Sequence, residues 1–123
     1  MELETMLYEK EGYVACLTLN RPHLLNAVNY RGSMELKSVT QEIHDDPDLR
    51  VVLIRGAGRA FCTGIDLKEL SAGNTPKAYF ENWDEALRML ERSGKLVLCA
   101  RHGYALGGGL QLPLACDIRI STE

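Results

Sequence analysis

The chain has 123 residues, of which 46% are hydrophobic and 25% are charged, values that are ordinary for one globular domain. Its 14 basic and 17 acidic residues give a net charge of −3 without any basic block, which argues against nucleic acid as a partner. No apolar run is long enough to span a bilayer, and the acidic N-terminal stretch matches neither a secretory signal nor a transit peptide. We therefore expect a soluble domain that acts away from membranes.

The four cysteines, Cys16, Cys62, Cys99 and Cys116, lie far apart in the sequence. No C-x-x-C pair occurs, so the spacing indicates neither a zinc site nor a redox motif. We expect four free thiols in a reducing compartment, which favours the cytoplasm.

The N-terminal third predicts a hairpin followed by a helix. Residues 5–22 contain two strand-like runs around Gly12, and the pair Arg21-Pro22 ends the second run. Residues 29–46 form an amphipathic helical pattern that the Asp-Asp-Pro sequence stops. Its apolar positions are Met34, Leu36, Val39 and Ile43.

Two later apolar runs, residues 50–58 and 96–103, are rich in β-branched or aliphatic side chains and predict strands that are buried on both faces. Residues 64–73 predict a short helix closed by Gly73, and residues 116–121 predict a last strand. Strands that alternate with helices indicate an α/β fold.

Residues 75–95 predict a longer helix, for which Thr75 supplies the cap, Pro76 the first helical position and Gly94 the end. Residues 109–115 are also helical in pattern. The apolar stripe expected on the longer helix consists of Phe80, Trp83, Leu87 and Leu90.

Two strand–loop–helix units each deliver unpaired backbone N–H groups at a helix N-terminus, at Ile65 and at Gly108. Glycines beside both positions allow a ligand to approach the main chain. If the two N–H groups face each other, they would form an oxyanion hole. Taken alone, each glycine segment is more simply explained as a tight turn. The run at residues 56–61 lacks the third glycine of a dinucleotide fingerprint, which disfavours that alternative.

Three motifs together resemble the crotonase superfamily of enoyl-CoA hydratases and isomerases. They are "LTLNRPHLLNAVN" at 17–29, "GRAFCTGIDLKEL" at 58–70 and "HGYALGGGLQLPLACDIRIS" at 102–121. The resemblance implies an α/β crotonase-like spiral of repeated ββα units. It implies that residues 1–123 are the N-terminal part of an acyl-CoA-binding domain, truncated before the C-terminal half.

The resemblance also implies the ligand and the site. An acyl-CoA thioester would bind with its oxygen at the amides of Ile65 and Gly108, and no metal or separate cofactor is needed because coenzyme A is part of the substrate. Lys68 or Arg59 would meet phosphates, unless they are solvated surface charges. Asp66 is expected to cap a helix rather than to catalyse. The residues assigned to the substrate path are Leu25, Asn26, Ala27, Gly64, Asp66, Leu67, Lys68 and Gly107.

Gln111 departs from the family, whose hydratases place a glutamate at this position. An amide cannot accept a proton at any useful pH, so Gln111 is not a general base, although it can hydrogen-bond a water or a substrate group. Its alternative task is to satisfy its own helix end. Pro113 is a second departure, because it crowds the carbonyl of Gly109 unless Gly109 caps the helix.

The family's second catalytic glutamate and the helices that assemble its trimers lie beyond the last residue, Glu123, in the resembling proteins. Three carboxylates on the helix at 75–95 could border the pocket, namely Glu81, Asp84 and Glu85. The simpler interpretation is that all three are charged residues on the helix surface. Without a C-terminal half, the apolar faces of the strands at 96–103 and 116–121 should be exposed. We expect either hydratase or isomerase-type chemistry through a thioester enolate, or a non-catalytic acyl-CoA-binding or oligomerising module.

Overall fold

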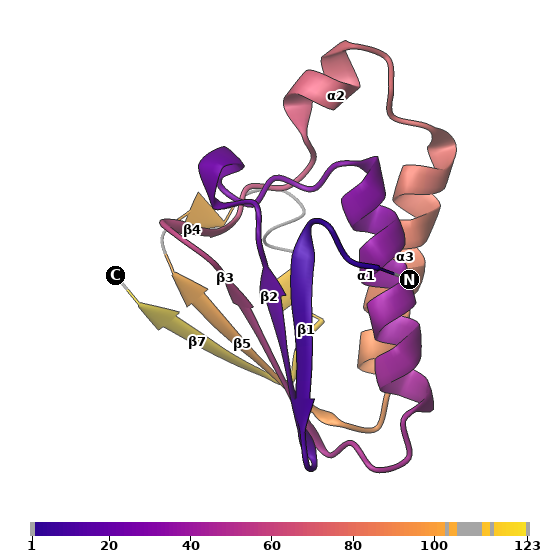
Figure 1. Ribbon diagram of the computed structural model, residues 1–123, viewed down its shortest axis with the longest axis vertical. Coiled ribbons are helices and arrows are strands. Elements are labelled where there is room, and N and C mark those ends of the chain that lie inside the picture. The colour runs from indigo at the N-terminus through magenta and orange to yellow at the C-terminus, as the bar shows by residue number, and fades with distance from the viewer. Residues whose placement is uncertain (1, 103, 106–111, 114, 123) are drawn as a thin grey trace.

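A five-stranded mixed sheet forms one layer of the protein, and two long helices form the other (Figure 1). The computed structural model describes residues 2–102, 104–105, 112–113 and 115–122. In that part of the chain, no helix is long and apolar enough to cross a membrane. The strands of the sheet, in spatial order, are β1 (Met6–Glu11), β2 (Val14–Leu19), β3 (Val51–Gly56), β5 (Leu96–His102) and β7 (Ile118–Thr122).

The remaining elements connect these strands. They are η1 (Pro22–Leu24), α1 (Tyr30–Asp45), β4 (Ala60–Cys62), α2 (Leu67–Ser71), α3 (Lys77–Glu91) and β6 (Tyr104–Ala105). Among the described strands of this sheet, β1 and β2 pair antiparallel, and the later neighbours pair parallel. The predicted hairpin is confirmed, with Gly12 at a φ of 60° in its turn. The α/β class and the helix at 29–46 are confirmed as well.

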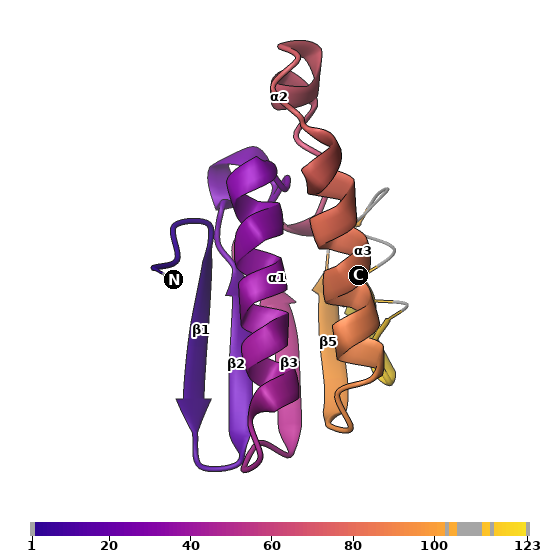
Figure 2. The same cartoon turned by 90° about the vertical axis from the view of Figure 1, so that its right-hand side faces the viewer.

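The predicted burial of β3 and β5 on both faces is wrong. Both long helices lie on the same side of the sheet (Figure 2), so only the side chains that face them are buried. Val52 and Ile54 are fully buried on that side, whereas Leu96 is 44% exposed on the other. The open face is largely apolar, as expected for β5 and β7. Its apolar residues include Val14, Val51, Leu53, Leu96, Leu98, Ile118 and Ile120.

The helix predicted at 75–95 is confirmed as α3, but its core-facing stripe is offset. Phe80 is 50% exposed, and Tyr79 is buried in its place. The predicted cap at Thr75 is also wrong, because Pro76 is the N-cap residue and no side chain caps this helix. The hydrophobic period alone did not fix the rotation of the helix, because Phe80 and Tyr79 are adjacent aromatic residues. The buried residues of α3 are Tyr79, Asn82, Trp83, Ala86 and Leu90.

A second, two-stranded parallel sheet of β4 and β6 was not predicted from the sequence. Its pairs are Ala60 with Tyr104 and Cys62 with Ala105. Each of its strands follows a strand of the main sheet. The strands β3 and β4, followed by the helices α2 and α3, thus form a strand–strand–helix unit, and β5 and β6 repeat the two strands. This is the arrangement expected for repeated ββα units.

A buried carboxylate joins α1 to the N-terminal segment. The side chain of Glu35 is fully buried and accepts hydrogen bonds from the Thr5 N–H and hydroxyl, from the Glu4 N–H, each at 2.9 Å, and from Arg31 Nε at 2.6 Å. Burial alone would raise the pKa of Glu35, but these donors outweigh it and lower the pKa below its usual value. A buried charge with four donors stabilises the fold in its ionised form.

We expect Glu35→Gln to lower the free energy of unfolding by about 2–3 kcal/mol near neutral pH, because charge-assisted hydrogen bonds are replaced by weaker ones. A carboxylate with a lowered pKa in the folded chain contributes stability above an unfolded-state pKa of about 4.3, and that contribution is lost as the pH falls through its folded-state pKa. Urea unfolding at several pH values should therefore show the difference between variant and wild type shrinking in acid.

The matched control is Glu42→Gln, which removes the same charge from an exposed position of the same helix. It should change stability by less than about 0.5 kcal/mol. A Glu35→Gln protein as stable as this control would contradict the assigned role of Glu35.

Candidate functional site

The loop that carries the first predicted substrate contacts has an unusual backbone. Leu25 and Asn26, which follow η1, both have positive φ angles, 53° and 57°. Asparagine tolerates the left-handed region better than most residues, but leucine does not. Two such residues in succession need support from the surrounding structure.

The side chain of Asn26 gives that support. It is 2% exposed, donates to the carbonyls of Ala57 and Ala60, each at 2.8 Å, and accepts from the Arg21 N–H at 2.7 Å. Thr63 adds a bond from its hydroxyl to the Leu25 carbonyl at 3.2 Å. Asn26 therefore holds this loop against the β3–β4 turn. Its own N–H donates to the Arg21 carbonyl at 3.0 Å, so neither its side chain nor its N–H is left for a ligand.

The same loop pairs with the second predicted segment through one isolated parallel bridge, between Val28 and Ile65. The Val28 N–H donates to the Gly64 carbonyl at 2.7 Å, and the Asp66 N–H donates to the Val28 carbonyl at 3.0 Å. In a parallel pair, a residue flanked by the bonded groups points its own N–H and C=O away from the partner strand. The N–H of Ile65 therefore points away from Val28.

Asp66 ends this extended segment and begins α2, as the sequence predicted for a capping carboxylate. Its side chain accepts from the Glu69 N–H at 3.1 Å through Oδ1, while Oδ2 lies 3.2 Å from the guanidinium of Arg21. Burial would raise the pKa of Asp66, but the Glu69 amide and the Arg21 charge lower it below its usual value. The carboxylate is thus ionised and held from two sides.

The other described residues of the predicted site lie around this point. Gly64 is buried with a φ of 92°, and Ala27 is half-buried beside the bridge. Leu67, 69% exposed, and Lys68 project from the short helix α2 into solvent. Gly107, Gly108 and Gln111, together with most of the predicted helix at 109–115, lie outside the described residues.

Two residues of this region were not identified from the sequence. The sequence indicates Arg21 only as the end of a strand, yet its side chain contacts the Ala27 carbonyl and Asp66. Tyr79 donates from its hydroxyl to the Val28 carbonyl at 3.0 Å, and burial raises its pKa. The motif "LNRP" shows that Arg21 lies beside the loop. No local pattern indicates that its partner is Asp66, more than forty residues away.

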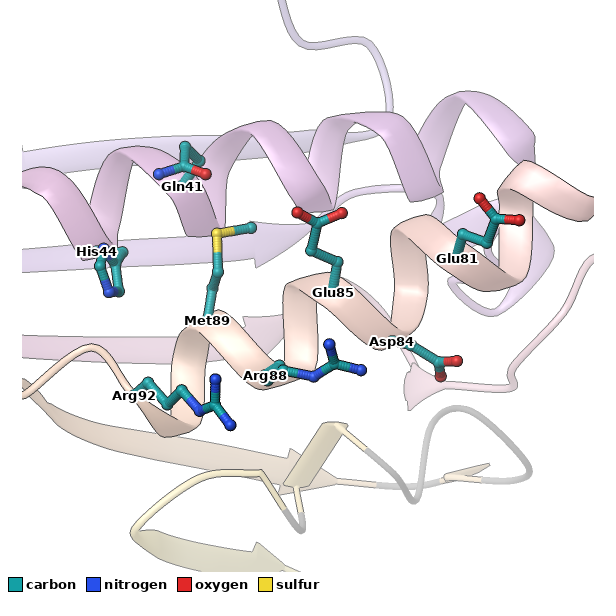
Figure 3. Close-up of a pocket in the computed structure, with 8 residues that line it drawn as sticks. All are labelled: Gln41, His44, Glu81, Asp84, Glu85, Arg88, Met89 and Arg92. Carbon is teal, nitrogen blue, oxygen red and sulfur yellow. The ribbon is translucent and has the colours of Figure 1, made fainter.

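A groove of about 570 Å³ lies elsewhere, between α1 and α3 (Figure 3). Its lining is mostly charged or polar, and Glu85 and Met89 point from α3 toward α1. Glu85 pairs with Lys37 at 3.2 Å, and Glu81 pairs with Lys77 at 3.7 Å, so the carboxylates of α3 are exposed surface charges, as expected. Such a polar surface does not suit an acyl chain.

The cysteines are free thiols, as predicted. Within the described part of the chain, no group of three or more histidine, cysteine, aspartate or glutamate side chains is placed to hold a metal ion.

Comparison with known proteins shows that the sequence of this chain matches one family. The sequence pattern of the enoyl-CoA hydratase/isomerase family matches residues 9–123. A short-chain-enoyl-CoA hydratase of Clostridium acetobutylicum is 39% identical over the whole chain, and an (E)-benzylidenesuccinyl-CoA hydratase of Thauera aromatica is 36% identical over 93% of it. The chain spans about half the length of these relatives, 48% and 45% respectively.

Solved structures give the same result. An enoyl-CoA hydratase/carnithine racemase from Magnetospirillum magneticum superposes with a TM-score of 0.87 at 34% identity, over 98% of this chain and 47% of its own. An enoyl-CoA hydratase/isomerase from Marinobacter aquaeolei has a TM-score of 0.85 at 29% identity, over 97% of this chain and 49% of its own.

We expect Asn26→Asp to lower the free energy of unfolding by about 2 kcal/mol near neutral pH, because a carboxylate would face the carbonyls of Ala57 and Ala60 without a proton to donate. Protonation restores one donor, so the introduced carboxyl should have a raised pKa in the folded chain. The stability of the variant relative to the wild-type chain should then recover as the pH is lowered. Chemical unfolding at several pH values measures this, with the exposed Asn20→Asp as the control.

Proposed function

Because the chain belongs to the enoyl-CoA hydratase/isomerase family, we propose that residues 1–123 form the oxyanion-hole part of an acyl-CoA thioester site. The ligand is the thioester itself, and no further cofactor or metal takes part. The proposed assembly is a homo-oligomer based on trimers, located in the cytoplasm, by analogy with the resembling family and with the four free thiols.

The observation that carries the proposal is the direction of the Ile65 N–H. The pairing with Val28 uses the N–H groups of Val28 and Asp66 on either side, which leaves the Ile65 amide directed away from the bridge. The segment is fixed at both ends, by the bridge and by the cap of α2. A fixed amide is the kind of preorganised donor that stabilises negative charge on a carbonyl oxygen.

Two donors make such a hole, and the second in this proposal is the amide of Gly108. Negative charge develops on the thioester oxygen when an enolate forms or when a nucleophile adds to the conjugated acyl group. One donor of this type is worth about 10²–10³ in rate in enzymes of other folds. The acyl-CoA would pass the backbone of Leu25–Ala27 and the segment Gly64–Lys68, with Lys68 available to a phosphate.

The proposed chemistry is hydratase or isomerase-type and proceeds through the enolate. Gln111 does not take part as a base, because its amide has no proton-accepting form at working pH. Gln111 instead hydrogen-bonds a water or the substrate. The same residue favours a second candidate function, a non-catalytic acyl-CoA-binding or oligomerising module, in which the thioester is held but not converted.

Replacement of the Ile65 amide by an ester tests the proposal most directly, because it removes the N–H and keeps the side chain. Ligation at Cys62 makes this substitution accessible, and Ile65→Pro is its genetic counterpart. We expect calorimetric titration with crotonyl-CoA to show binding to the wild-type chain and a loss of about tenfold in affinity in either variant.

The matched control is Lys77→Pro, since proline is tolerated at the first position of a helix and Lys77 begins α3 at an exposed site. Wild-type affinity in the folded Ile65 ester would contradict the role of Ile65. Binding without turnover in the wild-type chain would favour the module over the enzyme.

A further inference from the structure

One side chain contacts both strands of the Val28–Ile65 bridge. The guanidinium of Arg21 donates from Nη1 to the carbonyl of Ala27 at 2.5 Å, and its two terminal nitrogens lie 3.2 Å from Oδ2 of Asp66. Ala27 immediately precedes Val28, and Asp66 immediately follows Ile65. The cation therefore connects the two paired segments diagonally, across the bridge that orients the Ile65 amide.

Arg21 is itself held in place. Its backbone N–H donates to the Asn26 side chain at 2.7 Å, and its carbonyl accepts from the N–H groups of Leu24 and Asn26 at 2.9 and 3.0 Å. Its side chain and that of Asp66 are each only 15% exposed. Shielding from solvent makes this ion pair less sensitive to salt than a surface pair.

The contact geometry suits an arginine better than a lysine. A planar guanidinium presents several N–H groups in fixed directions and reaches a carbonyl and a carboxylate together. The ammonium of lysine is a point charge on a flexible stem and lacks this fixed geometry. The other oxygen of Asp66 remains on the Glu69 amide, so the carboxylate links Arg21 to the cap of α2.

We propose that Arg21 is a positioning residue of the oxyanion hole, which fixes the direction of the Ile65 N–H by joining Ala27 to Asp66. The inference depends on the proposed function, because it assigns Arg21 to the same amide. A hydrogen bond prefers an angle above about 150° and weakens steeply below about 120°, so a rotation of the Ile65 peptide away from the thioester oxygen would reduce polarisation of its carbonyl. Arg21 does not touch the substrate.

Infrared spectroscopy of crotonyl-CoA labelled with carbon-13 at the carbonyl measures that polarisation. We expect the carbonyl stretch to move to lower wavenumber on binding to the wild-type chain. In Arg21→Gln, we expect about half or less of this shift to remain, with affinity weakened about threefold to tenfold, and Arg21→Lys should be intermediate. Arg92→Gln, which removes an exposed arginine after α3, should keep the full shift.

Asp66→Asn provides a second variant if Arg21→Gln does not fold. Asparagine caps helices as well as aspartate does, so this change weakens chiefly the contact with Arg21. Its effect on the shift should match that of Arg21→Gln, and the double variant should add little more, because both changes break one interaction.

A full carbonyl shift in folded Arg21→Gln, or in folded Asp66→Asn, would overturn the positioning role. Failure of the proposed function itself looks different, because the wild-type chain would then bind crotonyl-CoA without any shift, or not at all, before a substitution is made. That result would overturn both proposals.

Discussion

The pairing of Val28 with Ile65 is the constraint on which the candidate site depends. It consists of two backbone hydrogen bonds, yet it joins the loop after β2 to the segment before α2. The Val28 carbonyl also accepts a bond from the Tyr79 hydroxyl, so α3 is attached at the same atom. The site is therefore set by where three distant segments meet, and no single motif contains it.

Apolar packing and buried polar side chains stabilise different parts of the structure around this pairing. The buried rows of the sheet and the two long helices provide the apolar burial that stabilises the fold. Polar side chains that are almost fully buried, Asn26 and Glu35, hold the two irregular segments that burial alone would leave free. Each is tied to backbone groups from a remote stretch of the chain.

Local patterns in the sequence were sufficient for the hairpin, α1 and the overall α/β class, since turn chemistry and helical periodicity are local. They also indicated α2, but this helix begins at Leu67, later than the predicted residue 64, because Ile65 pairs with Val28 as extended backbone. They were not sufficient for the rotation of α3 or for the second sheet, because these depend on which face the rest of the chain covers. The glycine-bearing turn and the family resemblance both indicated the segment around Ile65 as a candidate. The roles of Arg21 and Asn26 became visible only in three dimensions, because their partners are far away in the sequence.

The parallel register of the sheet affects how this chain reaches its native state. The β1–β2 hairpin closes a turn of a few residues, whereas Val14 pairs with Val51, and Val51 pairs with Leu96. Closing such long segments costs entropy before any contact repays it, and high contact order slows folding. The hairpin can form early, but the bridge at Ile65 requires these distant pairings. A ligand that contacts Ile65 would therefore slow unfolding of the native chain more than it would speed its folding.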